Sequence, residues 1–169
     1  MAEEAGAPPA ELTPEMLEKL RNLLSMDKEC NWYYAGEPIS HERTLQALHE
    51  GLGRDEEGRL IVQIGSAWSY VKAEDAAFAV RAVRQVGDPP EFFDLLLSDG
   101  TTERLDPARL TVGDGNVLYC KVKGGREDAR FLRPAYYQLA AHVGEDQPGG
   151  FALRAGGRRH PIGRRAARP

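Results

Sequence analysis

The chain has 169 residues, of which 41% are hydrophobic and 28% charged, and its formal net charge at pH 7 is -4. These values are typical of one globular domain or of two small halves sharing a core, and the negative net charge argues against nucleic-acid binding through bulk charge. The apolar runs are too short for a membrane span and the N-terminus has no secretory signal, so we expect a cytoplasmic protein with no membrane partner.

The N-terminal segment divides into a polar tail and a leucine-rich stretch. Residues 1–11 are rich in Ala, Glu, Gly and Pro, and we expect them to be disordered. Thr13 and Pro14 are typical of a helix start, because Thr is a good N-cap and Pro suits the first helical position. Leucines recur behind them at helical spacing, which predicts a helix to about Met26 within a helical segment at 12–30.

An aromatic stretch follows. Trp32, Tyr33 and Tyr34 predict a short strand, because aromatic residues favour strands and a turn containing Gly and Pro comes directly after them. By strand alternation we expect Trp32 and Tyr34 to anchor the following helix on the sheet. Tyr33 points the other way, toward solvent or a cleft near Glu37.

The remaining elements are joined mostly by short turns. A second helix is predicted at 41–52, with Ser40 as its N-cap and Gly53 after its end. A third helix is predicted at 134–143. Apolar runs bounded by turn residues predict strands at 60–64, 67–72, 78–86, 92–98, 101–105, 109–112, 116–123, 151–154 and 158–162.

Together these elements predict an α+β protein with about three helices and largely antiparallel sheets. A strand, a helix, a glycine and a further strand occur in this order twice, which suggests an internal repeat. We therefore divide the chain into a first α+β half at 31–106, a second at 107–162 and a disordered basic tail at 163–169. Residue identity between the halves is poor, so this interpretation depends on the order of elements alone.

Four short motifs occur in order along the chain. The first is NWYYAGEPISHERTLQALHEGL at 31–52, and EDAAF follows at 74–78. VLYCKV at 117–122 and ARFLRPAYYQLAAHV at 129–143 complete the series. In this order they resemble, over roughly residues 31 to 162, the bacterial domain-of-unknown-function family 1285.

The resemblance implies an α+β protein of two small halves with related folds. It implies no established enzymatic activity and only a loose association with ligand binding or signalling. This chain also departs from the family pattern, since Ala77 stands where the family prefers Pro. The runs IVQIGSAWSYV and LLLSDGTTERL lack polar residues that are usual there, so we do not carry over a pocket built from them.

The sequence offers no motif for catalysis or metal binding. His41 and His49 are eight residues apart, whereas zinc-binding pairs on a helix are closer. Cys30 and Cys120 form no CxxC pair, and Cys120 alternates with apolar neighbours as a small core residue does. Phosphate-binding loops and a GxSxG elbow are also missing. We therefore predict no catalytic residue, no metal and no cofactor.

Aromatic residues share a face with lysines in two predicted strands. Trp68 and Tyr70 do so in one strand, and Tyr119 alternates in phase with Lys121 and Lys123 in the other. Such a face suits a flat anionic ligand or a protein partner. It also suits a face covered by the leucine-rich helix, and we favour this second interpretation because the leucines need a surface to pack on. The candidate ligand-binding residues are Tyr33, Glu37, Trp68, Tyr70, Tyr119, Lys121 and Lys123.

The arginine-rich end can be a tail that binds nucleic acid or an acidic partner, or it can be a solvated tail. The lack of aromatic residues among its last positions favours the solvated tail. For the whole chain we expect a non-enzymatic module that binds a small ligand or a protein partner, with signalling as one use. The alternative is an enzyme, or an enzyme subunit, whose site is assembled from distant residues. A pocket with converging polar groups and shifted pKa values would favour the enzyme, whereas an open aromatic sheet face would favour binding.

Overall fold

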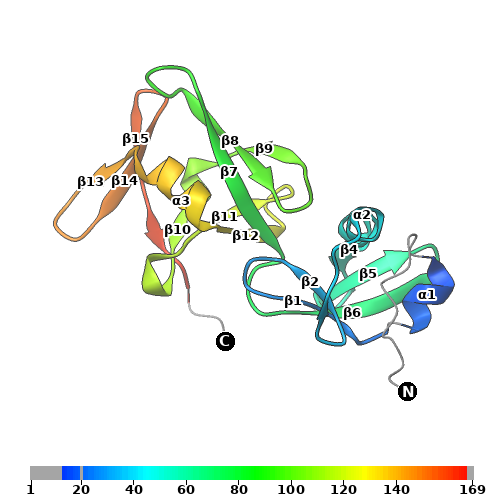
Figure 1. Ribbon diagram of the computed structural model, residues 1–169. Helices are drawn as coiled ribbons and strands as arrows, with labels where there is room; N and C mark the ends of the chain where they lie inside the picture. Colours follow the sequence, from blue (N-terminus) through cyan, green and yellow to red (C-terminus); the bar gives the residue numbers. More distant parts are fainter. Residues whose placement is uncertain (1–12, 20, 167–169) are drawn as a thin grey trace. The chain divides into compact units, whose positions relative to one another are not determined.

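The computed structural model describes residues 13–19 and 21–166 (Figure 1). This part of the chain forms three α-helices and three open sheets, so the predicted α+β class is confirmed. Two compact units divide between Asp75 and Ala76. The segment 1–11, expected to be disordered, lies outside the described residues. Within the described part, no helix has the length and apolar character needed to cross a membrane.

The first unit is built on a six-stranded sheet with the order β3-β2-β1-β6-β5-β4. Its strands are β1 (Leu24–Met26), β2 (Trp32–Tyr34), β3 (Glu37–Pro38), β4 (Leu52–Arg54), β5 (Leu60–Ile64) and β6 (Ala67–Ala73). Its helices are α1 (Pro14–Lys19) and α2 (Glu42–Gly51). β1 is parallel to β6, and the other neighbours are antiparallel.

Trp32 anchors α2 on this sheet, as strand alternation predicted. Its side chain is 2% exposed, and its ring meets the His49 ring of α2 edge to face, with the centroids 5.8 Å apart. α2 begins after His41 instead of Ser40, and it ends before Gly53, with Leu52 at its C-cap. The second helix is therefore confirmed with shifted ends, which is usual for boundaries read from local patterns.

The predicted extent of the first helix is wrong. α1 ends at Lys19, and Leu24–Met26 is a strand. Asn22 has a φ of 66°, a left-handed conformation that no right-handed helix contains. Leu24 and Met26 are buried on either side of half-buried Ser25, which is the alternation of a strand. The backbone of this segment pairs with β6, a partner distant in sequence, and that pairing overrides the helical spacing of the leucines.

The second unit combines a seven-stranded sheet, in the order β16-β10-β11-β12-β7-β8-β9, with a three-stranded sheet, β13-β14-β15. The first seven strands in chain order are β7 (Phe78–Val86), β8 (Phe92–Leu97), β9 (Thr102–Arg104), β10 (Thr111–Val112), β11 (Leu118–Val122), β12 (Glu127–Phe131) and β13 (Val143–Glu145). The last three are β14 (Phe151–Ala155), β15 (Arg158–Pro161) and β16 (Gly163–Arg164). α3 (Arg133–Ala140) lies between the small sheet and β7 (Figure 1), and 3-10 turns occur at Pro107–Arg109 and Asp114–Asn116.

The units divide earlier than the boundary predicted between residues 106 and 107. β7 is parallel to β12, with Phe78 opposite Ala129 and Val80 opposite Phe131, so the strands before and after residue 106 share one sheet. β12 was not among the predicted strands. Its charged residues, which include Glu127, hide the buried alternation from a reading of the sequence. Its pairing with β7 is remote in the sequence, whereas its other partner, β11, precedes it across a short turn.

The tail expected to be disordered from Gly163 onward is in part a strand. β16 is parallel to β10, and the backbone N–H of Arg165 donates to the carbonyl oxygen of Val112 at 2.8 Å. Residues 167–169 lie outside the described residues. The basic end is therefore an edge strand of the seven-stranded sheet up to Arg164.

Both units contain the same local succession of elements. In the first, α2 is followed by the antiparallel strands β4, β5 and β6. In the second, α3 is followed by the antiparallel strands β13, β14 and β15. In the second unit this succession brings α3 and the small sheet to one side of the pocket described below.

Candidate functional site

Tyr33 and Glu37, two predicted site residues, belong to the hairpin region of the first unit. The Tyr33 hydroxyl donates to the Asp27 carboxylate at 3.1 Å, and this hydrogen bond, with the negative charge of Asp27, raises the pKa of Tyr33. Glu37 is exposed and lies opposite Tyr34 across the β2–β3 pairing, whereas Tyr33 lies opposite Pro38. The Tyr33 side chain therefore supports the turn between β1 and β2.

Trp68 and Tyr70 lie on a half-buried face of β6, as their alternation predicted. Their rings meet edge to face, with the centroids 4.9 Å apart. The guanidinium of Arg21 lies 4.7 Å from the Trp68 ring centroid, and that of Arg59 lies 4.8 Å from the Tyr70 ring centroid. Arginine side chains thus cover part of this face, which is neither fully open nor buried.

The three predicted residues of the second unit are held by structural partners. Tyr119 is only 8% exposed, so it is covered, and the group that stacks on it, 3.7 Å from its ring centroid, is the Arg165 guanidinium. Lys121 and Lys123 are both ion-paired, as Lys121–Asp128 at 2.7 Å and Lys123–Asp99 at 2.7 Å. The seven predicted residues therefore fall in two different units.

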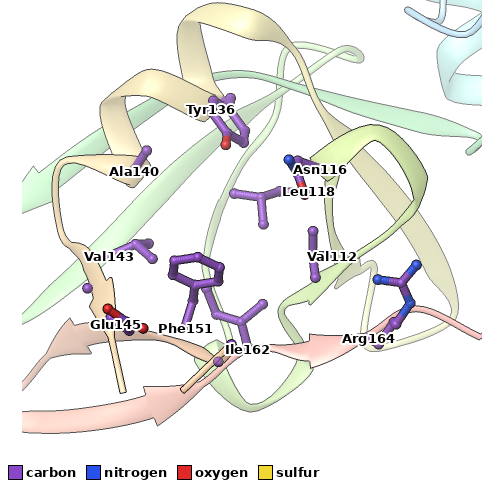
Figure 2. Close-up of a pocket in the computed structure, with 13 residues that line it drawn as sticks. Val112, Asn116, Leu118, Tyr136, Ala140, Val143, Glu145, Phe151, Ile162 and Arg164 are labelled. Atoms are coloured by element: carbon purple, nitrogen blue, oxygen red, sulfur yellow. The ribbon is translucent and has the colours of Figure 1, made fainter. Parts of the chain in front are cut away.

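A pocket of about 540 Å³ lies in the second unit (Figure 2), and none of its residues was predicted as a site residue. Its apolar side chains are Val112, Leu118, Ala140, Val143, Phe151 and Ile162. Its longer polar side chains are Asn116, Tyr136, Glu145 and Arg164. The volume is in the range of small-molecule binding sites, and so is the mixture of an apolar lining with a few polar groups.

One wall of the pocket comes from α3 and another from the β10–β11 hairpin. Tyr136 and Ala140 are one helical turn apart, so both face the pocket from one side of α3. The Gln138 side chain accepts a hydrogen bond of 2.7 Å from the backbone of β7, which holds the helix in place. Val112 and Leu118 are direct cross-strand neighbours and therefore share a face of the larger sheet.

The small sheet supplies a third wall. Glu145 and Phe151 lie opposite each other where β13 and β14 meet their connecting turn. That turn is closed by a hydrogen bond of 3.1 Å from the N–H of Asp146 to the carbonyl of Gly150. Phe151 is 56% exposed although it lines the pocket. An apolar ligand would therefore remove a large part of its ring from water.

β16 brings Arg164 to the pocket. Arg164 lies opposite Val112 in the parallel pairing, and Arg165 takes the other face of the strand, where it stacks on Tyr119. Arg164 also pairs with Asp114 at 3.4 Å, but these side chains are 76% and 104% exposed. An ion pair this exposed contributes little, because water screens it.

The charged groups lie on different sides of the apolar lining. In Figure 2, Arg164 and Asn116 lie on one side of Leu118 and Ile162, and Glu145 lies on the other. The guanidinium and amide groups can donate hydrogen bonds, whereas an ionised carboxylate only accepts them. The pocket can therefore bind and orient a molecule that has an apolar body and one anionic end.

The chemistry of Cys120 is that of a core residue, as predicted. The side chain is 1% exposed, and burial, assisted by the negative charges of Glu103 and Asp128, raises the pKa of its thiol to about 12. It is therefore protonated at neutral pH. Among the residues that the structure describes, no group of three His, Cys, Asp or Glu side chains is placed to hold a metal ion.

The sequence contained little that could have identified this pocket. The sequence places Arg164 in an expected solvated tail and Ile162 at the end of a predicted hairpin strand. The apolar Ile162 within a basic run was the one usable signal for an ordered segment. Its position beside β10 could not be inferred, because the pairing of β16 with β10 joins distant parts of the chain.

Solved structures with this fold support the resemblance seen in the motifs. A DUF1285 family protein from Silicibacter pomeroyi DSS-3 has 19% identity and a TM-score of 0.68, with 96% of this chain and 90% of that chain covered. A DUF1285 family protein from Shewanella baltica OS155 has 16% identity and a TM-score of 0.57, with 70% of this chain and 91% of that chain covered. This chain therefore has a DUF1285-like fold. No family model matches the sequence, and no curated protein matches it.

Proposed function

We propose that this chain is a non-enzymatic binding module whose second unit holds a small, mainly apolar ligand. The observation that supports this most directly is the pocket of about 540 Å³ with Phe151 56% exposed in its lining. Covering apolar surface contributes about 25 cal/mol per Å², before the cost of association is subtracted. A ligand that fills the space between α3, β10–β11 and β13–β14 therefore has a source of affinity.

The proposal includes a cytoplasmic location and two related halves. A buried cysteine with no disulfide partner, such as Cys120, is compatible with a reducing compartment. The related halves are supported by the helix followed by three antiparallel strands in each unit. Signalling would follow if ligand binding stabilised the second unit and changed its contacts with a partner.

A variant that fills the pocket tests the binding proposal. Ala140→Leu places extra carbon atoms on the pocket side of α3, whereas Ala141→Leu adds the same group at the next, exposed position. A panel of small apolar acids, alcohols and amines is screened by thermal shift on the wild type. A ligand that binds only the folded protein, present at a free concentration of 100 times its Kd, raises the free energy of unfolding by about 2.7 kcal/mol.

We expect the ligands found in this way to raise the melting temperature of the wild type and of Ala141→Leu, but not of Ala140→Leu. Equal shifts in all three proteins would place the ligand elsewhere. A panel with no stabilising member at all would argue against a small-molecule pocket.

A further inference from the structure

We infer that the ligand is a monocarboxylic acid with an apolar body, bound with its carboxylate at Arg164 and its apolar part against Phe151. This inference rests on the proposed function and specifies the chemical class that the same pocket selects. It follows from three features of the lining: the donor groups on one side, the apolar middle, and the carboxylate of Glu145 on the other side.

The donor side matches a carboxylate. The guanidinium of Arg164 presents N–H groups in a planar fork, which suits two parallel hydrogen bonds to a carboxylate. Its partner Asp114 is 3.4 Å away and fully exposed, so a ligand carboxylate can replace it and leave Asp114 solvated. Asn116 lies on the same side and can add an amide N–H.

The backbone that carries Arg164 is also held in place before a ligand arrives. Arg165, the next residue, stacks on Tyr119 and donates to Asp128 at 3.3 Å. Its backbone N–H bonds to Val112 at 2.8 Å. Because neighbours in a strand point to opposite faces, these contacts direct Arg164 toward the pocket. Because the backbone is already fixed, only the Arg164 side chain has to be ordered when the ligand binds.

The opposite side disfavours a second acid group. Glu145 is exposed and lies opposite Phe151 across the β13–β14 pairing, at the end of the apolar lining away from Arg164. A ligand with a carboxylate at both ends would bring its second charge toward Glu145, and like charges repel. The pocket therefore distinguishes a monocarboxylic acid from a dicarboxylic acid of the same length.

Three probes of equal chain length test this class: decanoate, 1-decanol and decanedioate. Their affinities for the full-length protein are measured by isothermal titration calorimetry at neutral pH and low salt. We expect decanoate to bind about tenfold more tightly than 1-decanol, because an ionised acceptor adds a charge-assisted hydrogen bond. Decanedioate should bind more weakly than decanoate.

Matched variants assign each effect to its residue. Arg164→Gln should weaken decanoate about tenfold and leave 1-decanol unchanged. Arg158→Gln removes an exposed arginine of β15 that does not line the pocket, and it should change neither affinity. Glu145→Gln should strengthen decanedioate severalfold and leave decanoate nearly unchanged.

The inference is overturned if 1-decanol binds as tightly as decanoate, if Arg164→Gln leaves the affinity of decanoate unchanged, or if none of the three probes binds. None of these results by itself excludes the pocket. The pocket is tested separately by the thermal-shift panel, in which Ala140→Leu should remove the stabilisation caused by other ligands. Weaker decanoate binding in Arg164→Gln, together with unchanged 1-decanol binding, supports the carboxylate site.

Discussion

Lys123 and Asp99 illustrate how charged residues become structural in the second unit. The ammonium of Lys123 lies 2.7 Å from the Asp99 carboxylate and 5.2 Å from the ring centroid of Phe78. Burial by itself would raise the pKa of Asp99, but hydrogen bonds from Lys123 and Thr101 outweigh it and lower this pKa. Lys123, which the sequence suggested for ligand binding, therefore stabilises the turn between β8 and β9 through its ion pair with Asp99.

At the same scale, replacing Cys120 should reveal a pH-dependent contribution to stability. The pKa of its thiol is raised from 9.0 to about 12 in the folded protein, chiefly by burial. The folded state therefore holds the proton more tightly than the unfolded state, so the contribution is complete below about pH 9 and is lost as the pH rises toward 12. Urea unfolding at about pH 8 and about pH 10.5 should show the advantage of the wild type over Cys120→Ala shrinking at the higher pH.

The matched control for this experiment is Val122→Ala, another buried position of β11 that carries no titratable group. The free energy of unfolding of Val122→Ala should fall below that of the wild type by nearly the same amount at both pH values. If the two variants changed with pH in parallel, the titration would belong to other groups.

At the scale of an element, the β2–β3 hairpin carries an unfavourable residue in its turn. Ala35 and Gly36 have φ values of 47° and 85°, so both are left-handed, as the two central residues of a type I′ turn are. Glycine adopts this conformation freely, whereas an alanine in the left-handed region costs the folded state about 1 kcal/mol or more of conformational free energy. The aromatic strand before the turn and its pairing with β3 hold Ala35 there.

Ala35→Asn should therefore stabilise the protein by about 0.5–1 kcal/mol, because asparagine tolerates the left-handed region and Asn-Gly is favoured in this turn. Ala35 is exposed, so the change removes no packing. The free energy of unfolding in urea measures the effect. Gly36→Ala serves as the opposite control and should destabilise the protein. An unchanged or lower stability of Ala35→Asn would mean that the turn relaxes in solution.

At the scale of the whole molecule, the C-terminal strand completes the second unit. β16 extends the seven-stranded sheet, Arg165 covers Tyr119, and Arg164 and Ile162 line the pocket. The segment that carries most of the positive charge at the end of the chain is therefore part of the fold and of the candidate site. Fold stability and ligand binding should depend on it together.

Truncation tests this dependence. A chain that stops after Ile162 loses the β10–β16 pairing, the stacking of Arg165 on Tyr119 and the ion pair of Arg165 with Asp128, and it should unfold several degrees lower. A chain that stops after Ala166 keeps all three and should melt close to the full-length protein. Thermal unfolding followed by circular dichroism makes the comparison. Equal melting temperatures for both truncations would show that β16 is not needed for stability.

Local patterns in the sequence determined the fold class and many of its elements. The helix at 42–51 and the one at 133–140 follow from their apolar spacing and their end signals. The strands at 60–64, 67–73 and 78–86 follow from apolar runs between turn residues, and each pairs with a strand next to it in the sequence. Such elements depend on hydrogen bonds and side-chain neighbours that are close in the sequence, so their signals are local.

The tertiary structure alone decided which strands pair in parallel and, through these pairings, the pocket. Among the strands that the sequence analysis does not predict are β1, β12 and β16, which pair in parallel with β6, β7 and β10. Parallel strands cannot be joined by a tight turn, so their partners are remote in the sequence. The pocket combines α3, the β13–β14 pair, β10–β11 and β16, and Arg164 reaches it only because β16 has such a partner.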